Sequence, residues 1–391
     1  MQKKAPWCVV FLLLELTFAY QPGAQSTHKK KSEKPQQLDS GYSLERDPAT
    51  GELRFREKAK EPGDAAASPG APLKIRVGVN LVEVAANVYA ADGSPVRGLT
   101  AGEFHIFEDG AAERIMYFDA SSQPASVALV FDASPSILRD TSEMKQAARA
   151  LVENLAPQDE AAFVDFSFHT YVQIPFTHDR PALDRAIDGV DVRKMFFDTG
   201  GSNIYQSVYL VAKKLFAERT GRKAIVLLTD GQDSGLGLTL DPASAVPHPD
   251  ETGGRLTFED VVRALAAAGI EVYAISTETR PRILTPAWLT AHARQTLLTR
   301  DDRDLGIPAY TLFLVELVRR AGGQLYFLRE AASLEDTYRQ IAENIRLQYS
   351  LGFYPGAGEQ RPGWHELRVE VSGHPEYRVA HRLGYYVPAS Q

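Results

Sequence analysis

The sequence predicts a doubly wound α/β domain, built on a mostly parallel sheet, with a β-sandwich-like unit formed by the N- and C-terminal segments that flank it. Three observations predict this class. Between Ser126 and Asn344, short apolar runs alternate with amphipathic helical patterns. These runs are continuous in Val, Ile, Leu and Ala, which is typical of strands covered on both faces. Strand-like patterns precede and follow this region, and 391 residues with 44% hydrophobic content are enough for two or three domains.

The first 24 residues have the features of a secretory signal peptide. Lys3 and Lys4 precede a largely apolar stretch from Trp7 to Tyr20, and small residues follow around Ala24. We therefore expect cleavage near Ala24 and a secreted, periplasmic or cell-envelope location. An uncleaved anchor is the alternative, but the stretch contains Glu15 and is shorter than the roughly 20 residues of a spanning helix.

Charge and cysteine content narrow the functional classes. The formal net charge is −7, which argues against a surface for nucleic acid or a polybasic membrane patch. Cys8 is the only cysteine and lies in the apolar stretch, so cleavage would leave a chain without disulfides or thiol catalysis. No later segment approaches spanning length, and we expect no membrane span after cleavage.

The segments on either side of the α/β region differ in kind. Residues 25–72 contain a basic cluster and the low-complexity stretch DAAASPGAP, so we expect a mostly disordered linker. Residues 73–122 predict a small β unit, in which two strand-like runs meet at the turn Glu108 to Gly110, a strong hairpin signal. Residues 347–388 return to β character in LQYSLGFYP, HELRVEV and YRVAHRLGYYV.

We expect residues 347–388 to pack with residues 73–122 in one sandwich, because each fragment alone is too small for a core. Two separate small sheets are the alternative. Five aromatic side chains of the second fragment are expected to fill this core rather than form a binding face: Tyr349, Phe353, Tyr354, Tyr385 and Tyr386.

The α/β domain is predicted over residues 123–346. Its strands are the runs VALVFD, AAFVDFS, YVQIPF, AIVLLTD, IEVYAIS and GQLYFL. Its helices lie near residues 138–155, 180–188, 204–217, 257–268, 309–322 and 333–346. Two stretches, 235–256 and 280–308, do not fit this alternation and are expected to be surface insertions. Ligands of such folds bind at the carboxyl ends of the strands, so the residues that follow the strands are the first candidates for a site.

The first strand of this domain ends in Asp132, and Ser134 and Ser136 follow at alternate positions. A carboxylate and two hydroxyls are hard ligands suited to Mg²⁺, Mn²⁺ or Ca²⁺ and poor for zinc or copper. The pattern D-x-S-x-S is weak evidence by itself, because Asp and Ser also cap helices.

Two further segments should reach the same edge of the sheet. DTGGSNIYQSVYLVAKKL places Ser202 after a glycine pair and directly before a helical pattern. KAIVLLTDGQDSG ends an apolar strand in Thr229, Asp230 and Gly231. Their hydroxyl and carboxylate groups are therefore expected beside Asp132.

With these residues the chain resembles a von Willebrand factor type A (VWA) domain. The positions that match its metal-ion-dependent adhesion site are Asp132, Ser134, Ser136, Ser202 and Asp230. More narrowly, the chain is similar to the VWA-related secreted bacterial proteins, whose flanks resemble VRGLTAGEFHIFEDGAAERIMYF, QYSLGFYP and HRLGYYVP. The resemblance spans about residues 75–388 and covers both flanks.

One position departs from the family pattern, which usually has Thr after the glycine pair where this chain has Ser202. Thr199 precedes the glycines and is the less suitable substitute. Serine offers the same oxygen with more rotamer freedom, so we expect a working but weaker site.

The resemblance implies a binding function. Ser134, Ser136 and Ser202 would bind the ion directly, while Asp132 and Asp230 would hold its waters. Mg²⁺ suits this arrangement because it prefers six oxygen ligands and gives up water reluctantly; Mn²⁺ and Ca²⁺ are alternatives. An Asp or Glu carboxylate of a protein partner would complete the coordination. We therefore expect an exported, adhesion-type interaction module and not an enzyme.

Two other functions stay open. One is a structural envelope protein with a vestigial metal site, and the other is a metal-dependent hydrolase. Against the hydrolase, the sequence has no G-x-S-x-G or H-E-x-x-H motif and no histidine near the Ser134 loop. We expect Asp233 and Ser234 to stabilise a turn, with lining of the crevice as the alternative, and His169 to be a surface histidine.

Overall fold

The computed structural model describes residues 35–47, 51–57, 81–91, 94–121, 123–191, 201–236, 256–292, 306–330, 334–355 and 361–387. All of them belong to one compact unit, Pro35–Gln391. The predicted signal peptide, residues 1–24, lies outside the described residues. Among the described residues, no helix is long and apolar enough to cross a membrane.

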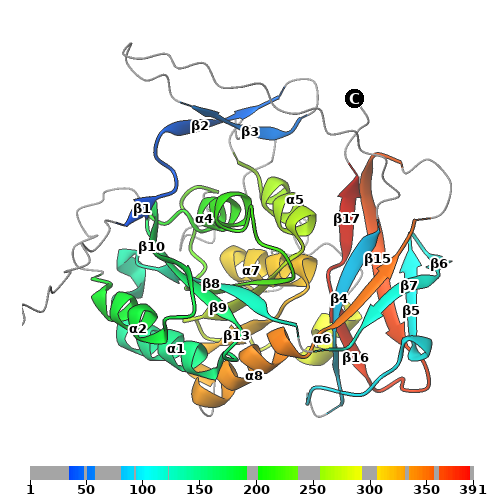
Figure 1. The fold of residues 1–391 in the computed structure, drawn as a ribbon. Helices are drawn as coiled ribbons and strands as arrows, with labels where there is room; N and C mark the ends of the chain where they lie inside the picture. Colours follow the sequence, from blue (N-terminus) through cyan, green and yellow to red (C-terminus); the bar gives the residue numbers. More distant parts are fainter. Residues whose placement is uncertain are drawn as a thin grey trace, which may run out of the picture. The chain divides into compact units, whose positions relative to one another are not determined.

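A seven-stranded sheet forms the centre of this unit, in the order β1-β10-β9-β8-β11-β12-β13 (Figure 1). The strands β9, β8, β11, β12 and β13 are mutually parallel, whereas β10 and β1 are antiparallel to their neighbours. Their bounds are β1 (Gln36–Gln37), β8 (Ala125–Asp132), β9 (Glu160–Phe166), β10 (Thr170–Thr177), β11 (Arg222–Thr229), β12 (Ile270–Ser276) and β13 (Leu325–Phe327).

Helices cover both faces of this sheet. One face carries α1 (Thr141–Asn154), α2 (Arg180–Gly189) and α8 (Leu334–Arg346), and the other carries α4 (Ile204–Leu210), α5 (Phe258–Ala268) and α7 (Ala309–Ala321). The turn of helix at Val211–Leu215, a π-helix, extends α4.

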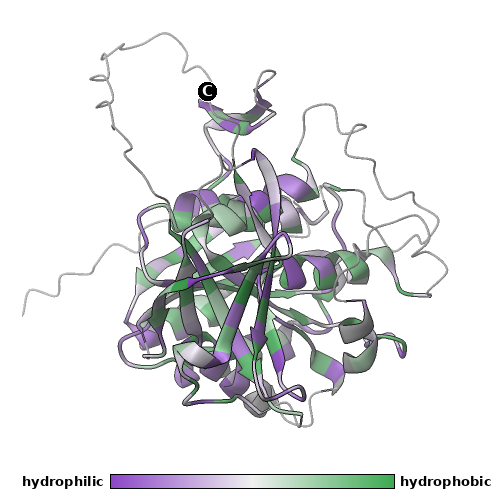
Figure 2. Cartoon of the chain, turned by 90° about the vertical axis from the view of Figure 1, so that its right-hand side faces the viewer, coloured by the Kyte–Doolittle hydropathy of each residue, from purple (hydrophilic) through white to green (hydrophobic). Residues whose placement is uncertain are grey.

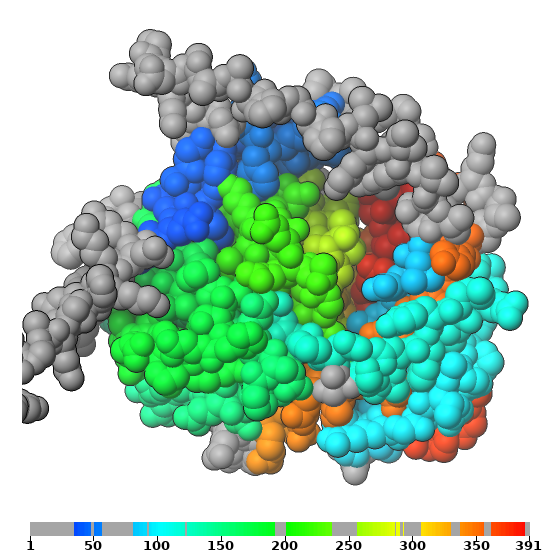
Figure 3. All heavy atoms as spheres, in the orientation of Figure 1, coloured from blue at the N-terminus to red at the C-terminus, as the bar shows by residue number. Residues whose placement is uncertain are grey.

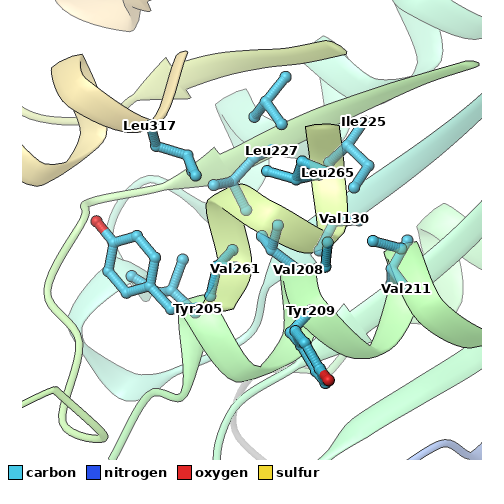
Figure 4. Packing of buried hydrophobic residues seen from close by; sticks show 14 of the residues in the cluster. Val130, Tyr205, Val208, Tyr209, Val211, Ile225, Leu227, Val261, Leu265 and Leu317 are labelled. Carbon is cyan, nitrogen blue, oxygen red and sulfur yellow. The ribbon is translucent and has the colours of Figure 1, made fainter. Parts of the chain in front are cut away.

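The central strand β8 shows why the sheet needs a layer of helices on each of its two faces. Leu129 belongs to the core cluster with α1, α2 and α8, whereas its neighbour Val130 packs with α4, α5 and α7 (Figure 4). Every residue of β8 is buried. A continuous apolar run is stable only with both faces covered, and the predicted doubly wound α/β class is confirmed.

Two four-stranded antiparallel sheets stand beside this domain. Their orders are β16-β4-β14-β7 and β17-β15-β5-β6. Both sheets combine strands from the two flanks of the α/β domain, since β4 pairs with β14 and β5 pairs with β15. The bounds are β4 (Val82–Tyr89), β5 (Phe104–Glu108), β6 (Ala111–Glu113), β7 (Ile115–Asp119), β14 (Tyr349–Phe353), β15 (Gly363–Val371), β16 (Arg378–His381) and β17 (Gly384–Val387).

Hydrophobic and hydrophilic residues alternate along the strands of these sheets, as Figure 2 shows. The apolar members share one core, which includes Tyr349, Phe353 and Tyr385. The expectation is wrong for Tyr354, which follows β14 and is 42% exposed. Tyr386 is partly exposed and its ring lies 4.8 Å from the Arg263 guanidinium.

The predicted hairpin after Phe104 is more complex than two strands. β6 pairs with β5, but the next strand, β7, leaves that sheet and pairs with β14 in the other one. The second strand-like run is therefore divided between the two sheets. Most of the first predicted insertion, residues 237–255, lies outside the described residues, and so do residues 293–305 of the second. The described part of the second insertion contains the short helix α6 (Pro286–Ala291).

The prediction of a mostly disordered linker is wrong for residues 35–57, which we call the N-terminal strap. It contains β1 and a hairpin of β2 (Tyr42–Arg46) and β3 (Leu53–Glu57). Leu38 and Leu53 are buried in the core cluster of α4 and α5, and β1 adds to the sheet edge at β10. Figure 3 shows the strap in blue against the green surface of the α/β domain. Its few apolar residues are enough because they pack against a surface that already exists.

Candidate metal centre

Asp132 is the last residue of β8, and its carboxylate is fully buried. One oxygen, Oδ1, accepts a hydrogen bond from the Ser134 backbone N–H at 2.9 Å. The other, Oδ2, accepts one from the Thr229 hydroxyl at 2.6 Å. The carboxylate therefore joins the loop after β8 to the end of β11, the neighbouring strand.

The two serines of the loop lie together. Their hydroxyl oxygens are 3.0 Å apart, with Ser134 buried and Ser136 exposed. Ser134 stands at the N-terminus of a short 3₁₀ turn, but its side chain makes no capping hydrogen bond there. The helix-cap interpretation of this serine therefore has no supporting contact, and its hydroxyl faces its neighbour instead.

Ser202 lies on a loop held from both sides of β8. The Asn203 N–H donates to the Ser167 carbonyl after β9 at 2.9 Å, and the Ser234 N–H donates to the Ser202 carbonyl at 2.7 Å. Because β8 lies between β9 and β11, these two bonds bring the Ser202 loop over the strand end that carries Asp132. Thr199, the other candidate at this corner, lies outside the described residues.

Gly201 permits this close approach. Its φ is +84°, and a Cβ built there would lie 2.2 Å from the Ser234 hydroxyl oxygen. A side chain at this position would displace Ser234 and strain the backbone. The glycine before Ser202 is thus required by the contact between the two loops.

The buried oxygens without a hydrogen-bond partner include two atoms of the predicted site residues at this edge, the Ser202 hydroxyl and Asp230 Oδ2. The other Asp230 oxygen accepts from the Gln232 N–H at 2.9 Å. Unpaired buried polar atoms are rare in native proteins and indicate a missing ligand or water. Both residues are 4% exposed or less.

Burial raises the pKa of Asp132 to about 7, and the neighbouring Asp230 carboxylate adds to this rise. Burial also raises the pKa of Asp230. Glu278, which follows β12, has a pKa raised by burial and then by Asp230. Among the residues that the structure describes, no Lys or Arg forms an ion pair with Asp132 or Asp230. A bound cation would offset this concentration of negative charge.

The donor set decides which cations fit. It consists of hydroxyl and carboxylate oxygens, which suit Mg²⁺, Mn²⁺ or Ca²⁺. Within the described ranges, no group of three or more His, Cys, Asp or Glu side chains could hold a metal ion. A site here would depend on serine hydroxyls, and the residues present fit that requirement.

Sequence reasoning missed the part that Thr229 takes in this site. Its hydroxyl donates to Asp132 and accepts from the Gly231 N–H at 3.0 Å, so it orients the carboxylate. The available signal was its position as the last residue of an apolar strand, directly before Asp230. Glu278 was missed for a different reason, since only the sheet order brings the end of β12 near Asp230.

The nearby polar residues have other partners. Asp233 accepts from the Leu236 N–H at 2.6 Å and from the Tyr205 N–H at 3.2 Å, so it stabilises the turn and the start of α4. Ser234 accepts from the Ser202 N–H at 3.3 Å. His169 is partly exposed, and its Nδ1 lies 2.5 Å from Asp39 of the strap.

Three solved structures that are similar to this chain share 12–17% sequence identity with it. An aerotolerance-related membrane protein of Bacteroides fragilis is 16% identical, covering 56% of this chain and 98% of its own, with a TM-score of 0.38. A von Willebrand factor type A protein of Catenulispora acidiphila is 12% identical, with coverages of 81% and 76% and a TM-score of 0.37. Proximal thread matrix protein 1 of the mussel byssus, solved with a zinc-occupied MIDAS motif, is 17% identical, with coverages of 61% and 49% and a TM-score of 0.38.

A search of the curated proteins finds no match. The family model of the von Willebrand factor type A domain matches residues 126–282. This range contains α1, β9, β10, α2, α4, β11, α5, β12 and all of β8 except Ala125, together with all five predicted site residues. The chain therefore contains a von Willebrand factor type A domain.

Proposed function

We propose that this protein is an exported interaction module whose VWA domain binds a protein partner through a divalent cation. Ser134, Ser136 and Ser202 would hold the ion directly, with Asp132 and Asp230 orienting its waters. The ion, Mg²⁺ before Mn²⁺ or Ca²⁺, would supply positive charge for an Asp or Glu carboxylate of the partner. The N-terminal sequence supports export to the cell envelope or the medium.

One observation carries this proposal. The Ser202 hydroxyl and Asp230 Oδ2 are buried at one strand edge and have no hydrogen-bond partner, beside a fully buried Asp132 carboxylate. Such groups cost free energy unless something pairs with them. A cation with its waters would pair with all of them at once.

Calorimetric titration of Mg²⁺ and of Mn²⁺ into EDTA-stripped protein tests the ion site. We expect binding to the wild type and none to Asp132→Ala. Asp165→Asn is the matched control, because Asp165 is a buried carboxylate of β9 whose Oδ1 accepts from Gln173 at 2.8 Å. Equal, undetectable binding by the wild type and Asp132→Ala would contradict the ion site.

The partner is tested by pull-down from envelope extracts, in Mg²⁺, in EDTA and with Asp132→Ala. A protein retained only by the wild type in Mg²⁺ is the expected result. Ion binding without any such protein would favour a structural role for the site. Hydrolysis of peptide or ester substrates that disappears in Ser134→Ala would favour an enzyme, although within the described chain no histidine hydrogen-bonds to Ser134 or Ser136.

A further inference from the structure

A cavity of about 630 Å³ lies between the N-terminal strap, α4 and the loop that follows β11. Its apolar lining comes from all three parts and from the turn between β9 and β10: Tyr42, Leu44, Phe168, Leu210, Leu236 and Leu256. This volume is within the usual range of ligand pockets.

The cavity begins next to the proposed ion site. Asn203 lines it and directly follows Ser202. Ser234, whose N–H donates to the Ser202 carbonyl at 2.7 Å, also lines it. Consecutive Cα atoms are about 3.8 Å apart, so the rim of the cavity lies within one residue of the third serine of the site.

The charges of the lining select its occupant. Its two acids already have partners, since Asp39 pairs with His169 and Asp233 accepts from backbone N–H groups. The described lining contains no basic side chain, so an acidic group of a partner would find no opposite charge here and would bind the cation instead. The Phe168 ring is 41% exposed at the rim and offers a neutral aromatic surface.

Polar contacts attach the strap, which forms one wall of the cavity, to the α/β domain. Arg46 of β2 forms an ion pair with Asp260 of α5 at 2.6 Å. The Lys214 ammonium lies over the Tyr42 ring, 2.7 Å from its centroid, and donates to the Leu38 carbonyl at 3.0 Å. A wall that is already ordered costs little conformational entropy when a ligand binds.

We propose that this cavity is a second recognition site for the same partner and takes a large apolar or aromatic side chain. That side chain lies within a few residues of the Asp or Glu that completes the ion. The recognised motif is thus an extended segment with an acid and a bulky apolar residue at a short, constant spacing. This inference rests on the proposed function, because it needs the ion to hold the acid.

Selection from a random-peptide library on phage, with the mature chain in Mg²⁺ and elution by EDTA, tests this motif. We expect enriched peptides to share one acid and one large apolar residue at constant spacing. Replacing either residue of the peptide by Ala should weaken binding about tenfold or more. A consensus that contains the acid but no apolar preference would overturn the cavity inference and leave the ion proposal standing.

Phe168→Ala then locates the apolar residue. We expect it to weaken the selected peptide about tenfold, with Mg²⁺ affinity unchanged, and to have no further effect on a peptide whose apolar residue is already Ala. Tyr117→Ala is the matched control, since Tyr117 is also 41% exposed but lies on β7.

Two results would overturn the inference in different ways. Equal weakening by Phe168→Ala and Tyr117→Ala would show that the cavity does not bind the apolar residue. Peptides that bind equally well in EDTA and to Asp132→Ala would contradict both the ion proposal and the inference that depends on it.

Discussion

Both ends of the central sheet bury charged side chains, but the charges that surround these side chains differ between the two ends. At the amino end, Arg222 of β11 donates to the Ser121 carbonyl at 2.7 Å and to the Gln348 carbonyl at 2.6 Å, and also to the Arg346 carbonyl. Residues 121 and 346–348 are the places where the chain passes between the VWA domain and the flanking sheets. The Arg222 guanidinium therefore holds both connections between the VWA domain and the flanking sheets in place.

Glu271 of β12 completes this amino-end junction. It accepts from the Tyr273 hydroxyl at 2.8 Å and from the Gln348 amide, and Tyr273 in turn accepts from Asn87 of β4 at 3.2 Å. One Glu271 oxygen, Oε1, lacks a hydrogen-bond partner, but the carboxylate is near the positive Arg222. Opposite charges and bonds across the junction identify it as a structural joint.

At the carboxyl end, two carboxylates of the same sign, Asp132 and Asp230, lie together with an unpaired Ser202 hydroxyl. The amino end has an opposite charge within the chain, in Arg222 beside Glu271, whereas in the proposed function the positive charge at the carboxyl end comes from a bound cation. Burial and raised pKa values alone do not separate a joint from a site. The sign of the neighbouring charges does, because each end has an unpaired oxygen but, within the described residues, only the amino end has a positive charge beside its buried carboxylate.

The largest effect is expected at the amino-end junction. Arg222→Met should lower the free energy of unfolding by about 4 kcal/mol, because it removes three hydrogen bonds and leaves three carbonyl groups at the junction without this donor. Urea denaturation followed by circular dichroism measures this change. Arg219→Met, which removes a more exposed pair with Glu160 at 3.5 Å, is the control and should change the free energy of unfolding by less than about 0.5 kcal/mol. Similar losses in the two variants would contradict the assigned role of Arg222.

The next largest effect is expected for Asp132→Asn, and this effect is on the affinity for the ion. We expect its affinity for Mg²⁺ to fall about 100-fold, or about 2.7 kcal/mol, because the residue that orients the ion's waters loses its charge. The rise in melting temperature on adding Mg²⁺ should disappear, while Asp165→Asn keeps it. If Mg²⁺ still raises the melting temperature of Asp132→Asn, the Asp132 carboxylate is not needed for ion binding. The proposed difference between the two ends of the sheet would then be wrong.

The amino end should contribute to the pH dependence of stability through Glu271. Burial raises the pKa of Glu271 from 4.5 to about 8, so the folded state favours the protonated acid. Its contribution is fully present below the unfolded pKa and is lost as pH rises through about 8. Glu271→Gln, whose amide oxygen can still accept from Tyr273, should therefore be more stable than the wild type by about 2 kcal/mol near pH 9. Near pH 5 the two proteins should unfold at nearly the same urea concentration, and a constant difference at all pH values would contradict the assignment.

The smallest effect is expected at the third serine of the site. Ser202→Thr should raise Mg²⁺ affinity roughly threefold, because a β-branched side chain has fewer rotamers to lose. Ser202→Ala should lower the affinity by about tenfold, which calorimetry can distinguish. If Thr weakens binding, the loop between Gly201 and Ser234 has no room for the extra methyl group.

Much of this fold could be predicted from the sequence because its signals are local. The run Val127 to Phe131 is apolar at every position, and only a strand covered on both faces suits such a run. The acids and hydroxyls that follow the strands of a parallel sheet must meet at one edge, which is why Asp132 and Asp230 could be named together. The sequence by itself therefore determined the class of the α/β domain and the chemistry at its strand ends.

The tertiary structure decided what depends on contacts between distant residues. The strap has a composition typical of disorder, and it folds because Leu38 and Leu53 pack on a core more than 100 residues away. The division of β6 and β7 between two sheets, the contact of Gly201 with Ser234 and the cavity beside Ser202 are of the same kind. Local patterns specify which elements form, but the free energy that places a weakly patterned segment comes from surfaces supplied elsewhere in the chain.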